Sequence, residues 1–291
     1  MITPARPSTD RLSTLSRTQI LRDPWPAFET FEADRYPRAL RERTARQWWR
    51  RAREEYGSIH EFTALSHVLC EVRAPIDLLG GLSRLITDEV RHAELCATMA
   101  RALLPDVAAE TVYDWAPPKA PWPTPPLEGG DRMALTRWAA DVVLCACCLG
   151  ETLSRPLYEA LATVTTDPVP EAVVRQILRD EHLHATFGWE ALTFLLTELD
   201  EPSIEYLQKR LSKRLAGFEH TCTPEGKSIE AFAGTEVVIE PPGPDASPNL
   251  GLLDPEVYAT IFYATLESEI LPRFDELGFD AMRAWQERGR R

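Results

Sequence analysis

The chain has 291 residues, of which 44% are apolar, and its net charge is −13. This length is enough for one large domain or two small ones with a sizeable core. The acidic balance argues against nucleic acid or an anionic membrane surface as the main partner. We expect no membrane span, because no run of about 18 apolar residues stands out. The first residues lack the apolar core of a secretory signal, so we expect a cytoplasmic protein.

The first half of the chain predicts two long helices. Residues 1–37 are rich in proline, serine and charge, and we expect them to form an arm or loose wrap. Helical patterns follow over residues 39–73 and from about residue 75 to 104, where Pro75 suits a first helical turn. The six prolines of residues 111–130 exclude helix and central strand, so this segment is expected to be an extended crossover.

The second half predicts two further long helices and a C-terminal extension. The long helices are expected at about 131–164, where Pro156 favours a kink, and at about 170–199. The extension is predicted to hold a helix over 202–220, a loop over 221–252 with one short strand at 235–239, and a helix over 254–288 interrupted near Gly278.

This order of elements predicts an all-α fold. Short turns join each pair of long helices into an antiparallel hairpin, and one long crossover joins the hairpins, as in ferritin-like bundles. We therefore expect an arm over residues 1–37, a four-helix bundle over 38–200 and a helical extension over 201–291 packed on the bundle.

One short motif occurs twice on the predicted helices. The chain carries Asp88-Glu89-x-x-His92 and again Asp180-Glu181-x-x-His184. Residues three apart lie on the same helix face, so each copy directs a carboxylate and an imidazole to one point. Two such pairs, with one further glutamate from each partner helix, make the ligand set of a two-metal carboxylate bundle.

The two further glutamates are sought at matching heights in the hairpins. Glu151 lies among apolar residues at helical spacing, where an unpaired carboxylate would be costly to bury. On the first helix Glu55 lies in an apolar stripe, and Glu55-x-x-Ser58 matches Glu151-x-x-Ser154. We predict Glu55 and Glu151 as ligands and keep Glu61 as a reserve ligand.

On these residues the chain resembles the ferritin-like di-iron carboxylate superfamily, over roughly residues 40–200. It is most similar to bacterial ferritin-like domain proteins with Asp-Glu-x-Arg-His-Ala and Gly-Glu-Thr motifs, which stand here at 88–93 and 150–152. The first copy also resembles the hydroxylase subunits of bacterial multicomponent monooxygenases, which are much longer. The resemblance implies that Asp88 and Asp180 support the ligating histidines and that Arg91 steadies the aspartates. The second copy has Leu183 where that arginine would stand.

Carboxylate and imidazole ligands favour iron or manganese. We expect two iron ions, with manganese or a mixed manganese–iron pair as alternatives. Cys96, Cys148 and Tyr158 are candidates for lining a substrate pocket, with core packing as the simpler interpretation. The clustered Cys145, Cys147 and Cys148 are expected to be reduced core residues.

These residues predict a non-haem di-iron oxidase or oxygenase that uses dioxygen to oxidise a small organic substrate. The alternatives are a ferroxidase or other iron-handling protein, and a non-catalytic helical scaffold. The segments outside the bundle favour the oxidase over storage, because they would crowd a cage subunit. No flavin or nicotinamide motif occurs, so any reductase is expected to be a separate protein. A homodimer is left open.

Overall fold

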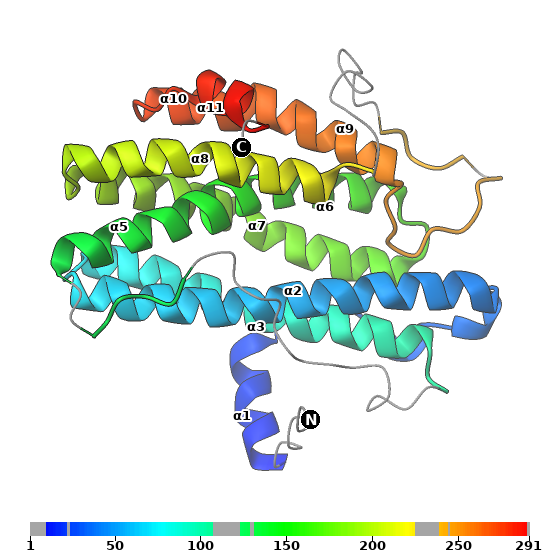
Figure 1. Cartoon of the computed structure of the whole chain (residues 1–291). Helices are drawn as coiled ribbons and strands as arrows, with labels where there is room; N and C mark the ends of the chain where they lie inside the picture. Colours follow the sequence, from blue (N-terminus) through cyan, green and yellow to red (C-terminus); the bar gives the residue numbers. More distant parts are fainter. Residues whose placement is uncertain are drawn as a thin grey trace.

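The protein is helical in a computed structural model that describes residues 10–21, 24–106, 123–128, 131–224, 239–243 and 245–289. Within these ranges no β-strand occurs. Four long helical segments lie side by side, and further helices cover one side of them (Figure 1). The expected strand at 235–239 and most of the crossover at 111–130 lie outside the described residues.

The first hairpin consists of α2 (Arg38–Glu71) and α3 (Ile76–Leu103). The turn between them includes Arg73, whose φ of 58° reverses the chain. Pro75 stands immediately before α3 and cannot continue a helix, so it separates the two elements. The predicted helices at 39–73 and 75–104 therefore form with ends shifted by only one or two residues.

The second hairpin consists of a composite third helix and α7 (Pro168–Thr197). The third helix is built from α5 (Arg132–Val142), a π-helical segment η3 (Val143–Glu151) and α6 (Thr152–Val164). The side chain of Asp167 accepts a hydrogen bond from the amide of Val169 at 2.9 Å and so caps α7. The helix continues through Pro156, and its irregular stretch lies before this proline rather than at it.

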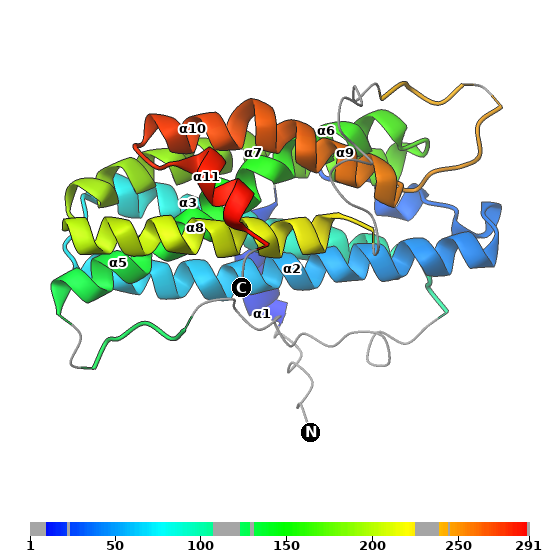
Figure 2. The ribbon, with the colours of Figure 1, turned by 45° about the horizontal axis from the view of Figure 1, so that its top comes forward.

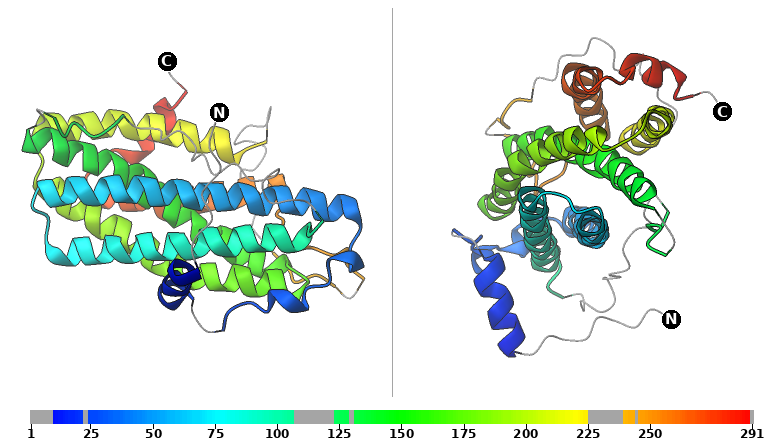
Figure 3. Two further views of the ribbon diagram at one scale, coloured as in Figure 1. Left: turned by 90° about the horizontal axis from the view of Figure 1, so that it is seen from below. Right: turned by 90° about the vertical axis from the view of Figure 1, so that its left-hand side faces the viewer.

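The remaining helices pack around the two hairpins. On one side lie α8 (Glu201–Cys222), α9 (Pro255–Thr265), the π-helical η5 (Leu266–Ile270), α10 (Leu271–Glu276) and α11 (Ala281–Glu287) (Figure 2). On the other side α1 (Asp10–Ile20) runs across α3 (Figure 3). The segment over residues 1–37, which we expected to be an arm or loose wrap, holds this helix and the short 3₁₀ turns η1 (Phe28–Thr30) and η2 (Ala33–Arg35).

The third helix is also the most apolar part of the described chain. Residues Arg132–Val164 are long and apolar enough to cross a membrane by length and composition, contrary to the expectation from the sequence. However, 72% of the most apolar window is buried against the other helices. Burial in a protein core accounts for this composition, as for other central helices. Cys145, Cys147 and Cys148 are free and buried here, as expected.

The core is divided by a layer of polar residues. Along α2, Ala52 belongs to one apolar cluster and Phe62 to the other, with Glu55 between them. Along α3, Leu85 and Leu95 bracket the first copy of the motif in the same way. The doubled motif therefore lies in the middle of the hairpins, between two apolar clusters that seal it from both ends.

Beside this layer α7 and η3 approach each other closely. A Cβ atom placed on Gly188 would lie 2.7 Å from Cys147 Cβ and 2.8 Å from its carbonyl carbon. Only glycine fits such a contact without moving the backbone. Gly188 follows His184 by one helical turn, and Cys147 precedes Glu151 by one turn. This contact therefore positions the second hairpin next to its polar residues.

Candidate metal centre

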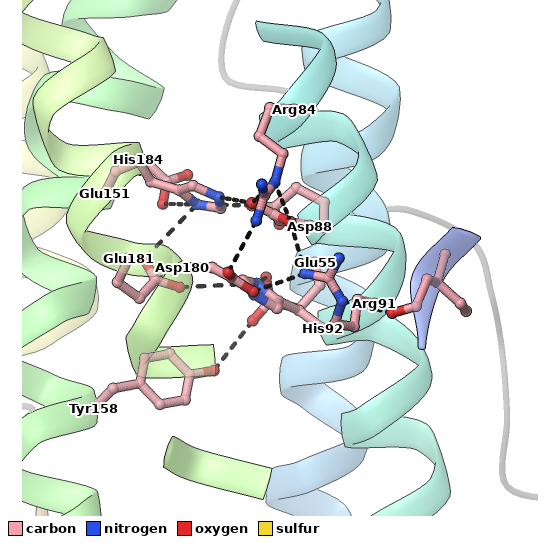
Figure 4. A network of polar contacts seen from close by, with 12 residues as sticks. Glu55, Arg84, Asp88, Arg91, His92, Glu151, Tyr158, Asp180, Glu181 and His184 are labelled. Carbon is pink, nitrogen blue, oxygen red and sulfur yellow. Dashed lines mark hydrogen bonds and ion pairs between the residues drawn. The ribbon is translucent and has the colours of Figure 1, made fainter. Parts of the chain in front are cut away.

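The six predicted ligands come from all four long helices and meet between them (Figure 4). Two overlapping groups have ligand atoms within 4.8 Å of one another: Glu55, Glu89 and His92 in the first, and Glu89, Glu151 and His184 in the second. Glu181 lies between the histidines, with its oxygens 3.8 Å from His92 Nδ1 and 3.9 Å from His184 Nδ1. This arrangement of buried carboxylates and imidazoles could hold a metal ion.

The glutamates play two geometric roles. Glu55 Oε2 lies 3.8 Å from His92 Nδ1, and Glu151 Oε2 lies 3.3 Å from His184 Nδ1, so each is associated with one histidine. Glu89 belongs to both groups, and Glu181 reaches both histidines. The two glutamates of the repeated motif are thus central, whereas those from α2 and η3 are peripheral.

Each histidine is oriented by the aspartate of the other motif. His92 Nε2 lies 3.3 Å from Asp180 Oδ2, and His184 Nε2 lies 3.5 Å from Asp88 Oδ2. Because α3 and α7 run in opposite directions, the start of one motif faces the end of the other. Both Nδ1 atoms are consequently turned toward the glutamates, and the imidazole rings stand 5.6 Å apart between centroids.

Two arginines from α3 neutralise the pair of aspartates. Arg91 Nη1 lies 2.6 Å from Asp88 Oδ1 and 2.8 Å from Asp180 Oδ2, as the resemblance implied. Arg84 Nε contacts both oxygens of Asp88, at 2.8 and 2.9 Å, and Arg84 Nη2 reaches Asp180 at 3.3 Å. Arg84 was missed in the sequence, although its spacing of four residues from Asp88 is a typical helical ion pair.

The support extends beyond the bundle. Arg91 Nε donates a 2.6 Å hydrogen bond to the carbonyl oxygen of Ile20, the last residue of α1. Arg91 is only 3% exposed, and Asp88 is fully buried. The segment that was expected to be a loose arm therefore contributes a hydrogen bond to the residues behind the histidines.

The acid–base properties of the cluster follow from its burial. Burial raises the pKa of Glu89 well above its usual value, and the nearby charges of Glu55 and Glu151 raise it further. Burial likewise raises the pKa of Glu181 to about 8. Burial also acts to raise the pKa of Glu55, but the combined interactions with His92, Glu89 and Tyr158 outweigh it and lower the pKa to about 2. The two central carboxylates, Glu89 and Glu181, therefore resist ionisation in this space unless a cation compensates their charge.

The protonation of His92 is also altered by its buried surroundings. Burial would lower the pKa of His92, but the hydrogen bond with Asp180 and the negative charges of Glu55 and Glu181 outweigh burial and raise the pKa to about 9. Within the described residues, His92 Nδ1 and Glu181 Oε2 are buried without a hydrogen-bond partner. Buried polar atoms of this kind are rare in native proteins and indicate a ligand or ion. The donor set and its unpaired atoms thus fit a divalent cation.

A cavity of about 640 Å³ adjoins the cluster. Glu55, Glu151 and Glu181 lie on its wall, together with residues of α6, α8 and α9. Tyr158 also lines it and donates a 3.1 Å hydrogen bond from its hydroxyl to Glu55 Oε1. The C-terminal helices therefore enclose a space next to the carboxylates.

The other candidate residues occupy different positions. Cys96 and Cys148 are fully buried in the apolar clusters and are not part of the lining of this cavity, so core packing describes them better. Cys145 lines it instead. The reserve ligand Glu61 lies on the cavity wall but outside both groups of ligand atoms. Burial and the charge of Glu151 raise the pKa of Glu61 to about 7.

Comparison of the chain with protein-family models, with curated proteins and with solved structures found no match. The arrangement of residues within this chain therefore carries the functional interpretation.

Proposed function

We propose that the protein is a ferritin-like di-metal oxidoreductase that uses dioxygen to oxidise a small organic substrate. The single observation that carries this proposal is the apolar cavity of about 640 Å³ with Glu55, Glu151 and Glu181 on its wall. A storage protein or scaffold has no need for such a space beside its buried carboxylates.

The metal would be held by all six predicted ligands. His92 and Glu55 would form one terminal pair, and His184 and Glu151 the other. Glu89 and Glu181 lie between the histidines and would complete the donor set from the middle of the site. Four carboxylates and two neutral imidazoles balance two divalent cations, and this oxygen and nitrogen donor set favours iron or manganese.

The surrounding residues prepare these ligands. Asp180 would accept a hydrogen bond from His92 Nε2, and Asp88 lies 3.5 Å from His184 Nε2. A proton held at each Nε2 by these aspartates would leave each Nδ1 lone pair directed inward. The hydroxyl of Tyr158 holds Glu55 from the cavity side. When bound, two ferrous ions would supply the electrons for dioxygen reduction. The leucines and aromatic residues of the cavity would exclude water from the substrate.

Metal analysis after anaerobic loading tests the centre. We expect about two iron or manganese ions per chain. Glu89→Ala and Glu181→Ala should each lose bound metal while the helical circular dichroism is retained, because each removes a central carboxylate. Glu190→Ala is the matched control, since Glu190 is an exposed glutamate on the same helix as Glu181. A wild-type protein that retains no metal would refute the proposal.

Iron handling is the second candidate, because two further carboxylates, Glu54 and Glu61, line the cavity and could pass cations inward. The two functions differ in stoichiometry. An oxidase stops near two irons per chain and consumes dioxygen with substrate, whereas a storage protein continues to oxidise and retain ferrous iron far beyond that ratio. Continued uptake on titration with ferrous iron in air would therefore favour iron handling.

A further inference from the structure

The cavity beside the metal centre contains a guanidinium group that the centre does not use. Arg51 lies on α2, one helical turn before Glu55, and lines the cavity wall. Its Nη1 donates a 2.9 Å hydrogen bond to the carbonyl oxygen of Gly251, and its guanidinium carbon lies 4.7 Å from the centre of the Trp48 ring. These two contacts hold the side chain in place without neutralising it.

The neighbouring charges are already balanced. Glu54 pairs with Arg50 at 3.5 Å, and Glu55 is directed to His92 and Tyr158. Behind the histidines, two aspartates face two arginines, and the proposed ligand set balances two divalent cations. Among the described residues, no carboxylate lies within ion-pair distance of Arg51. Arg51 is therefore a cation on the wall of the cavity that forms no ion pair with the described carboxylates.

The field of Arg51 extends into the cavity. Burial and the charge of Glu55 raise the pKa of Tyr158, and the Arg51 guanidinium acts in the opposite direction on the same hydroxyl. The pKa of Tyr258 on α9 is likewise raised by burial, Cys222 and Glu54 and lowered by Arg50 and Arg51. A cation whose charge is felt by buried groups is weakly screened by solvent, which makes it an effective partner for an anion.

The shape of the cavity suggests how a ligand would lie. A second cavity of about 500 Å³ adjoins the first, and both are lined by Gln47, Arg50, Cys222 and Tyr258. It adds Arg43, which is exposed and lies two helical turns before Arg50 on the same face of α2. Cationic side chains thus mark the route inward, while Leu157, Leu161 and Phe218 line the interior.

We propose that the substrate of this centre is an organic anion, whose carboxylate or phosphate group pairs with Arg51 while its apolar body lies in the cavity beside Glu55 and Glu151. The proposal rests on the proposed function in so far as it names the substrate class of that site. The binding step itself requires only the cavity and Arg51, so it can be tested on metal-free protein.

Calorimetry with three matched probes tests the charge preference. The probes are 6-phenylhexanoate, 6-phenylhexyl phosphate and the neutral 6-phenylhexan-1-ol, which share one apolar body. We expect at least one anion to bind about 10-fold or more tightly than the alcohol, as a charge-assisted hydrogen bond in a partly buried site allows. The tighter anion identifies the head group. Equal affinity for all three probes, or no anion binding below about 1 mM, would overturn the proposal.

Variants of arginines on α2 assign the preference to one residue. Arg51→Gln should remove the advantage of the anion over the alcohol. Arg46→Gln, the matched control, removes the same charge from an exposed position on the same helix and should leave the preference intact. Arg51→Lys keeps the positive charge and should retain most of the preference even if Arg51→Gln fails to fold. Loss of the preference in the lysine variant, or its persistence in a folded glutamine variant, would contradict the assignment.

Metal content separates this inference from the proposed function. If the protein binds two ions but shows no preference for anions, the substrate class is wrong and the metal centre stands. If anions bind at Arg51 but no metal is retained, the cavity is an anion site without the proposed chemistry.

Discussion

The two helices that carry the repeated motif, α3 and α7, contribute the same candidate ligands but unequal support. Each supplies an aspartate, a central glutamate and a histidine. Only α3 adds charge-balancing arginines, at positions 84 and 91. The residues found 92 positions later on α7 are Gln176 and Leu183. Because the antiparallel crossing brings Asp88 and Asp180 together, one pair of arginines serves both. A symmetric ligand set therefore does not need symmetric support.

Arg91→Leu should have the largest effect, because it gives α3 the residue that α7 carries and leaves two buried carboxylates with less compensation. Removing one partner of a buried ion pair costs about 3–5 kcal/mol of the free energy of unfolding. Urea denaturation of metal-free protein would measure it. A loss below about 1 kcal/mol would show that Arg84 alone balances both aspartates.

Replacement of each aspartate tests whether it orients the histidine of the other motif. Asp180→Asn and Asp88→Asn should each weaken metal binding about 10- to 100-fold, since each removes the negative charge that holds the Nε2 proton of a histidine in the proposed ligand set. Chelator competition would measure the affinity, and ring-nitrogen NMR would identify the histidine affected. The structure predicts that Asp180→Asn perturbs His92 and that Asp88→Asn perturbs His184. The opposite assignment would contradict the antiparallel geometry.

The other two long helices, α2 and the third helix, also differ at one matching position, which is occupied by Glu61 on α2. Glu55 and Ser58 of α2 correspond to Glu151 and Ser154, but Glu61 corresponds to Leu157, and both Glu61 and Leu157 line the cavity. The pKa of Glu61 is raised from 4.5 to about 7. Between these values the unfolded chain releases the proton while the folded protein retains it, so the stability contributed by protonated Glu61 is present below about pH 4.5 and lost by about pH 7.

Glu61→Gln should remove this loss. Near pH 4.5 this position should contribute equally to the free energy of unfolding of the variant and of the wild type. As the pH rises, the variant should become the more stable of the two, by about 1–2 kcal/mol above pH 7 after allowance for screening in the cavity. Denaturation of metal-free protein at several pH values would measure the difference. A constant difference across the range would show that Glu61 does not titrate abnormally.

Leu183→Arg should have the smallest effect and tests whether the missing arginine of the second motif matters. Leu183 is 41% exposed, and Arg84 and Arg91 already contact Asp180. We expect a change within about 0.5 kcal/mol in stability, as for other surface substitutions. A clear gain in stability or in metal affinity would mean that the support from α3 is incomplete.

The long helices and the six clustered residues could be predicted from the sequence, because both depend on local spacing. Glu55 was separated from Glu61 by counting residues from the hairpin turn, and the structure groups Glu55, not Glu61, with Glu89 and His92. Pro75 and the six prolines of residues 111–130 located two of the breaks between helices. These signals involve neighbouring residues or a simple hairpin register, so one sequence suffices to read them.

Other features depend on contacts between distant segments and were missed. The helix α1 is held partly through Arg91 and the carbonyl of Ile20, which are 71 residues apart. The shared use of Arg84 follows from the crossing of α3 and α7. The π-helical geometry of η3 was not predicted, and the cavity is lined in part by residues of α8 and α9, which are distant in the sequence from the third helix.

Because Gly188 packs directly on Cys147, even its replacement by alanine would disturb the candidate metal centre. Replacing one hydrogen atom of Gly188 by a methyl group would insert a wedge between α7 and η3, one turn away from both His184 and Glu151. Random mutation can reach alanine there by a single small change that leaves every ligand intact. The candidate centre therefore restricts which residue can stand at position 188, although Gly188 itself carries no functional group.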